Sequence, residues 1–138
     1  MANRTFSETL RVGNPEIVNL YCKFTAVNSG AQTLAGKPHN YGITSVAVSG
    51  TGLYTITLND NYEALLSVKA IADDSGASSG TYFEVASESV QTTTGDAGGT
   101  VALQALAGAT PGAEALTAGD IVWVELVLLN NSGNMPQS

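Results

Sequence analysis

Hydrophobic residues alternate with polar ones along most of this chain, and this period of two limits the possible folds more than any other feature. Every second residue is apolar from Val18 to Ala26, and the same spacing recurs at 54–58 and 62–70. Successive side chains of a strand point to opposite faces, so this spacing is typical of strands with one buried and one solvated face. No segment of useful length has a helical period, although residues 113–118 could hold one helical turn.

Turn-forming residues divide these runs into eight predicted strands. Gly50-Thr51-Gly52 predicts a tight hairpin, and Asn59-Asp60-Asn61 predicts a second one. The predicted strands cover residues 4–12, 17–27, 41–48, 53–59, 62–72, 81–90, 100–107 and 120–130. In 138 residues, about eight strands predict a single-domain all-β fold, an antiparallel β-sandwich or jelly roll. Residues 1–15 are then an N-terminal arm or edge strand, and residues 16–138 are the β-sandwich domain.

The last predicted strand is apolar on both faces. One face carries Val122, Val124, Leu126 and Leu128. The other face is interrupted only by Glu125 and carries Ile121, Trp123, Val127 and Leu129. Such a strand is either covered by another element of its own chain or lies at a subunit interface. The second alternative makes these last four residues a candidate subunit interface.

The net charge of −7 is unevenly distributed along the chain. All five basic residues precede Ala70, and eight of the twelve acidic residues follow it. Binding to nucleic acid or to an anionic membrane needs clustered Lys and Arg, so we expect neither partner. The acidic half is suited to a basic protein surface, or it serves only to keep the surface soluble.

The residues that could carry chemistry are few. Cys22 and His39 are the only thiol and the only imidazole, so they provide neither a disulfide nor a set of zinc ligands. Cys22 lies between Leu20 and Phe24 on the apolar face of its strand, where a cysteine is usually a small buried hydrophobe. Asp73-Asp74 lacks the spacing of a calcium loop. We therefore expect no enzyme, no catalytic residue, no metal and no cofactor.

Two segments carry a resemblance to a known group of proteins. The first has the pattern Gly52-x-Tyr54-x-Ile56-x-Leu58, followed by Asp60-x-Tyr62-x-Ala64-Leu65-Leu66. The second is the closing apolar strand, which ends in Asn131-Ser132. Together they resemble small structural proteins of tailed bacteriophages, the head decoration or cement proteins.

The resemblance implies a non-enzymatic virion protein that binds the outer capsid surface and stabilises the head. It implies a homo-oligomer, a trimer, with the major capsid protein as partner, made in the host cytoplasm and located on the capsid exterior. The N-terminal arm offers candidate capsid-docking residues, which are Arg4, Phe6, Leu10 and Arg11. The alternative is a tail-fibre or receptor-binding β module that recognises a host glycan. A small β-sandwich enzyme acting on polysaccharide is a third possibility.

Overall fold

The computed structural model describes residues 15–36, 39–73, 81–91, 98–107, 112–113 and 115–131, which form ten strands and no helix. The strands are β1 Pro15–Thr25, β2 Gly30–Ala31, β3 Thr33–Leu34, β4 Ile43–Gly50, β5 Leu53–Leu58, β6 Ala64–Asp73, β7 Thr81–Ser89, β8 Thr100–Ala107, β9 Gly112–Ala113 and β10 Ile121–Asn131. Seven of the eight predicted strands are present at nearly the predicted positions. The strand predicted at 4–12 lies outside the described residues, as do Arg4, Phe6, Leu10 and Arg11.

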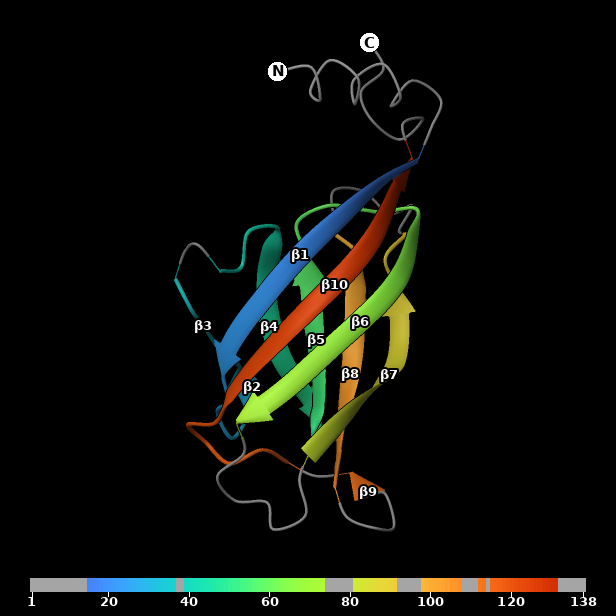
Figure 1. The fold of residues 1–138 in the computed structure, drawn as a ribbon. Coiled ribbons are helices and arrows are strands. Elements are labelled where there is room, and N and C mark those ends of the chain that lie inside the picture. The colour runs from blue at the N-terminus through green and yellow to red at the C-terminus, as the bar shows by residue number, and fades with distance from the viewer. Residues whose placement is uncertain are drawn as a thin grey trace.

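The strands form two antiparallel sheets, which confirms the all-β sandwich. Sheet A has the order β3-β1-β10-β6, and sheet B has the order β2-β4-β5-β8-β7 with β9 paired beside β8. In Figure 1 the strands β1, β10 and β6 form one layer, which runs obliquely across β4, β5, β8 and β7 behind it. The first and last described strands are therefore neighbours at the middle of one sheet.

Strand β10 organises sheet A. It pairs with β1 along all eleven residues, from Pro15 opposite Asn131 to Thr25 opposite Ile121. Its other edge pairs with β6, from Asp73 opposite Ile121 to Ala64 opposite Leu129. Because both edges of β10 are paired, its backbone hydrogen bonds are made within the sheet.

The core lies between the inner faces of the two sheets. Sheet A contributes Leu20, Cys22, Phe24, Val122, Val124, Leu126 and Leu128, and sheet B contributes Val46, Tyr54, Ile56, Leu58, Val101, Leu103 and Ala105. The rings of Phe24 and Tyr54 meet across the sandwich with centroids 5.5 Å apart. The Tyr54 hydroxyl accepts a hydrogen bond from the Leu116 backbone N–H at 3.3 Å, which seats the buried Leu116 at one end of the core.

Of the two hairpins predicted from the sequence, one is present in the structure and the other is not. Residues 51 and 52 link β4 to β5 as predicted, with Gly52 at φ 65°. The predicted hairpin at Asn59-Asp60-Asn61 is wrong, because this segment crosses from β5 in sheet B to β6 in sheet A. Strand β5 already pairs with β4 and β8, so no edge of it is free for β6.

A β-bulge in β6 reverses the predicted orientation of two leucines. The alternation places Leu66 inside, but Val127 pairs with Ser67 and the next residue, Leu128, pairs with Leu65. The extra residue shifts the register by one, so that Leu65 packs against the core and Leu66 is 49% exposed. The helical turn considered at 113–118 is also absent, since Ala113 belongs to β9 and residues 115–118 are not helical.

Gly98 and Gly99 allow three backbone segments to meet where β5 ends. The Leu58 N–H donates to the Gly99 carbonyl oxygen at 2.8 Å, and the Gly99 N–H donates to that of Asp60 at 3.1 Å. A Cβ added at Gly98 would lie 1.7 Å from the Leu58 carbonyl oxygen, and one at Gly99 would lie 2.5 Å from the Val90 carbonyl oxygen. This glycine-rich stretch is therefore used for close backbone packing.

Gly98→Ala should consequently destabilise the fold, because the new methyl group would collide with backbone that cannot move independently. We expect a loss of roughly 3 kcal/mol in the free energy of unfolding, measured by urea denaturation. Gly36→Ala is the matched control, since a Cβ at Gly36 meets no atom within 4 Å, and should change stability by less than about 0.5 kcal/mol. Equal stability of the two variants would contradict this account.

Candidate interaction surface

The four residues of β10 that the sequence predicts as a subunit interface lie on the outer face of sheet A. The pairings align its side chains in rows across β1, β10 and β6. These rows are Thr25–Ile121–Asp73, Lys23–Trp123–Ile71, Tyr21–Glu125–Lys69, Asn19–Val127–Ser67 and Ile17–Leu129–Ala64. The four predicted interface residues of β10 therefore share one face, and their apolar neighbours come from the two flanking strands.

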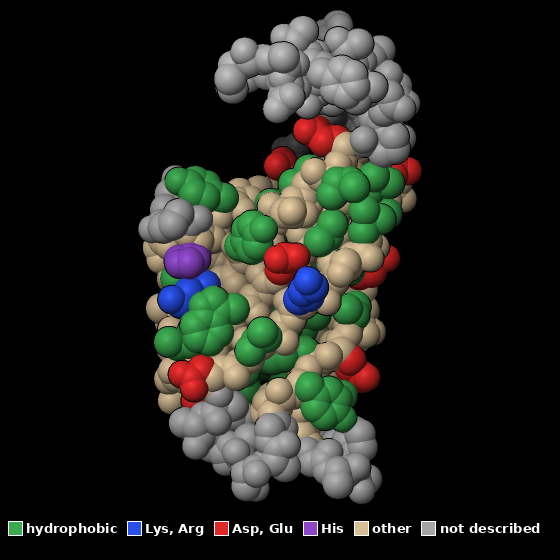
Figure 2. Space-filling view, viewed as in Figure 1, with side chains coloured by type: hydrophobic (Ala, Val, Ile, Leu, Met, Phe, Trp, Pro, Cys, Tyr) green, Lys and Arg blue, Asp and Glu red, His purple; other side chains and the backbone are tan. Residues whose placement is uncertain are grey.

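No other described segment covers this face. Ile17 is 64% exposed, Ile71 is 68% exposed, and Tyr21 and Trp123 are 53% and 41% exposed. Ile121, Val127 and Leu129 are half-buried between the side chains of the flanking strands. Figure 2 shows hydrophobic side chains spread over this side of the molecule. Several exposed large apolar residues on one sheet face are typical of a protein-interaction surface.

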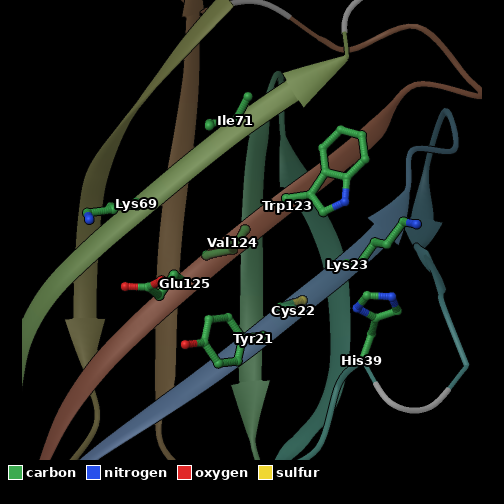
Figure 3. Close-up of a pocket in the computed structure, with 9 residues that line it drawn as sticks. All are labelled: Tyr21, Cys22, Lys23, His39, Lys69, Ile71, Trp123, Val124 and Glu125. Atoms are coloured by element: carbon green, nitrogen blue, oxygen red, sulfur yellow. The ribbon is translucent and has the colours of Figure 1, made fainter.

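A shallow hollow of about 380 Å³ lies within this face. Its lining residues are Tyr21, Cys22, Lys23, His39, Lys69, Ile71, Trp123, Val124 and Glu125. Figure 3 shows Lys23, His39 and Trp123 toward one side of the hollow and Lys69 toward the other, with Tyr21 and Glu125 between the strands. Cys22 and Val124 are buried, so they contribute mainly backbone to its floor.

The side of the hollow formed by β1 is held by Asn40. The Asn40 side-chain amide accepts a hydrogen bond from the Lys23 N–H at 2.9 Å and donates to the carbonyl oxygens of Lys23 and Ala35 at 2.8 and 2.9 Å. Its backbone N–H donates to the Tyr21 carbonyl oxygen at 3.0 Å. Asn40 has a φ of 65°, a left-handed conformation that asparagine tolerates better than most residues. Strand β3 pairs only with Phe24 and Thr25 of β1. At Lys23, the Asn40 side-chain amide makes the backbone hydrogen bonds that a longer neighbouring strand would otherwise make.

Lys23 is oriented by a cation–π interaction as well. Its ammonium group lies 5.5 Å from the centroid of the Trp123 ring on the neighbouring strand. Such a contact contributes about 0.5–1 kcal/mol at an exposed site. The positive charge is therefore held against the aromatic part of the face.

The described lysines and the described histidine all border this hollow. Among the described residues of the chain, Lys23 and Lys69 are the only Lys or Arg residues and His39 is the only histidine. All three line the hollow. Most described acidic residues lie elsewhere, and Glu125 is the one carboxylate in the lining. In Figure 2 the positive side chains and the histidine are visible among the hydrophobic ones. The sequence pattern did not reveal this cluster, because it depends on the register of three strands and on a loop.

The candidates for catalysis are not arranged as a reactive pair. Cys22 is 2% exposed on the inner side of β1, and burial raises the pKa of its thiol to about 12. His39 lies on the outer side of the same sheet (Figure 3). Among the described residues, no three His, Cys, Asp or Glu side chains are grouped so that they could hold a metal ion. No helix in the described part of the chain is long and apolar enough to cross a membrane.

Cys22 should resist thiol reagents in the folded protein, because it is buried and its reactive thiolate form is disfavoured. At pH 8, we expect labelling to be slow in buffer and complete after unfolding in urea. Cys22→Ala provides the unlabelled control. Rapid labelling of the native protein would mean that the strand register places Cys22 outward.

We compared the chain with family models, curated proteins and solved structures, and no match was found in any of the three comparisons. The outer face of sheet A and the fold that presents it are therefore the basis for assigning a function.

Proposed function

We propose that this chain is a non-enzymatic virion structural protein, a capsid decoration or cement protein that binds the outer surface of a tailed-bacteriophage head and stabilises it. The observation that carries the proposal is the uncovered apolar face of sheet A. A protein that acts by binding other proteins needs such a surface on a rigid support, and here the support is three strands paired over most of their length.

The segments that resemble decoration proteins have structural positions in the sandwich. Tyr54, Ile56 and Leu58 are buried core residues of β5. Tyr62 is buried where the chain crosses between the sheets, and Leu65 packs against the core. The closing apolar segment is β10. The resemblance thus concerns residues that build the domain, and it does not by itself identify the residues that contact a capsid.

Self-association is part of the proposal, with a trimer as the expected state. A shell protein repeats one contact many times by symmetry, so each copy needs only an ordinary protein interface. The proposed position is the capsid exterior, with the major capsid protein as partner. The acidic residues are then left largely toward solvent.

Purified protein mixed with capsids that lack it should occupy the shell in a saturable manner and raise its melting temperature. Bound copies stabilise the state they bind, so the shift should grow with occupancy. Occupancy can be measured by sedimentation of the capsids and melting by calorimetry. Absence of binding to any capsid, together with specific binding on a host-glycan array, would favour the receptor-binding alternative.

Removing residues 1–14 should weaken capsid binding without unfolding the domain. All described strands remain in this variant, because β1 begins at Pro15. The removed segment contains Arg4, Phe6, Leu10 and Arg11, the candidate docking residues. We expect at least tenfold weaker binding and a melting temperature within a few degrees of the full chain. Unchanged affinity would show that the docking surface lies within the sandwich.

A further inference from the structure

The hollow on the outer face of sheet A combines aromatic rings with polar groups of both charges. Tyr21 and Trp123 are both exposed, and neither belongs to the core. Figure 3, which looks onto the outer face of β1 and β10, shows both rings nearly face-on. Each ring therefore turns a face toward solvent. The aromatic side chains that pack in the core are buried instead, as for Phe24, Tyr54 and Tyr62.

The strand pairing fixes the spacing of the two rings. Tyr21 lies opposite Glu125, which is two residues from Trp123, so the aromatic residues are diagonal neighbours on adjacent strands. Diagonal neighbours on one face of a sheet are roughly 7–8 Å apart. The floor between them is formed by Cys22 and Val124, whose side chains are buried. A flat ligand can therefore rest on one ring and reach the other.

Neither sign of charge dominates around the rings. Lys23 and Lys69 line the hollow, but Glu125 lies directly opposite Lys69, and Asp73 lies on the same outer face of β6. A polyanion would therefore meet carboxylates here, and a strongly basic partner would meet ammonium groups. A wholly apolar ligand would displace water from these charged groups without replacing its hydrogen bonds. The hollow is thus suited to a neutral ligand that is polar at its edges.

We propose that this hollow binds a neutral carbohydrate. A pyranose ring packs on Trp123 and Tyr21, because its C–H groups are attracted to the negative faces of aromatic rings. Its hydroxyl groups form hydrogen bonds with the ammonium groups of Lys23 and Lys69 and with the carboxylate of Glu125. A hydroxyl group both donates and accepts, so one ring can satisfy donors and an acceptor at the same site.

The size and position of the hollow agree with this ligand. Its volume of about 380 Å³ is at the lower end of the range for ligand pockets, roughly 300–1,000 Å³, and suits a mono- or disaccharide. The Lys23 ammonium group, 5.5 Å from the centroid of the Trp123 ring, lies within reach of the hydroxyl groups of a saccharide on the indole.

This binding site goes beyond the proposed function and does not depend on it. The proposed capsid-docking residues precede Pro15, where β1 begins. Tyr21 and Lys23 lie roughly 20–26 Å further along this strand. The apolar row of Ile17, Leu129 and Ala64 lies nearer to Pro15 and stays uncovered when the hollow is occupied. A bound saccharide therefore leaves the Pro15 end of the face free for a capsid.

Trp123 is the only tryptophan of the chain, so its fluorescence reports on this hollow alone. The full chain is applied to an array of oligosaccharides built from neutral hexoses and N-acetylhexosamines, and the disaccharide of the strongest class is then titrated in solution. We expect a saturable change in Trp123 emission with a Kd of about 1 mM or tighter. Binding should persist in about 0.5 M NaCl, because contacts made by rings and hydroxyl groups are little affected by screening.

Tyr21→Ala and Trp123→Ala should each weaken binding at least roughly tenfold, measured by calorimetry, because each removes a ring on which the saccharide packs. Tyr82→Ala is the matched control. Tyr82 is 44% exposed on β7 in the other sheet, so its removal should leave the Kd unchanged. Circular dichroism and melting show whether each variant is folded.

Absence of binding to every saccharide on the array, or equal weakening by Tyr82→Ala, would overturn the inference. Binding that is lost in salt, or tighter binding of inorganic phosphate or of an acidic peptide in the same titration, would also overturn it, since either result indicates an anion site. Capsid binding is measured on the same preparation. Capsid binding without saccharide binding would overturn this inference alone, and saccharide binding without capsid binding would overturn the proposed function alone.

Discussion

The structure depends on the pairing of β10 with both of its neighbours. This strand is apolar on two faces, and its position at the middle of sheet A gives each face a separate role. The inner residues Val122, Leu126 and Leu128 are fully buried in the core. The outer residues lie between those of β1 and β6, and these lateral contacts cover them only in part. The same strand therefore stabilises the domain and leaves an apolar surface exposed.

Much of the fold could be predicted from the sequence, because alternation is a local property. Cys22 and Phe24 are buried and Trp123 is outward, as the period of two indicates. Alternation does not show which strands are neighbours. For this reason the turn residues at 59–61 predicted a hairpin, whereas the chain crosses there from one sheet to the other. The bulge near Leu66 could not be predicted either, because an extra residue in a strand becomes evident only from its pairing with the neighbouring strand. The two-residue strands β2, β3 and β9 are too short for a periodic signal.

The candidate surface was predicted only in part for the same physical reason. Trp123 and its apolar neighbours on β10 follow from a single strand. The hollow depends on Lys23, Lys69 and His39, which are separated in sequence and meet through strand pairing and the Asn40 loop. A single outward lysine on a strand is unremarkable. What gives these residues significance is that the two described lysines and the described histidine border one hollow on the outer face of sheet A.

The irregular edges of the sandwich affect how copies of the protein associate at high concentration. Strands β6 and β7, which end their sheets on the same side, each contain a bulge. Straight open edges can join those of neighbouring molecules and extend without limit into fibres. Interrupted edges resist such growth. At these two edges, joining between neighbouring copies is therefore disfavoured even when the protein is concentrated.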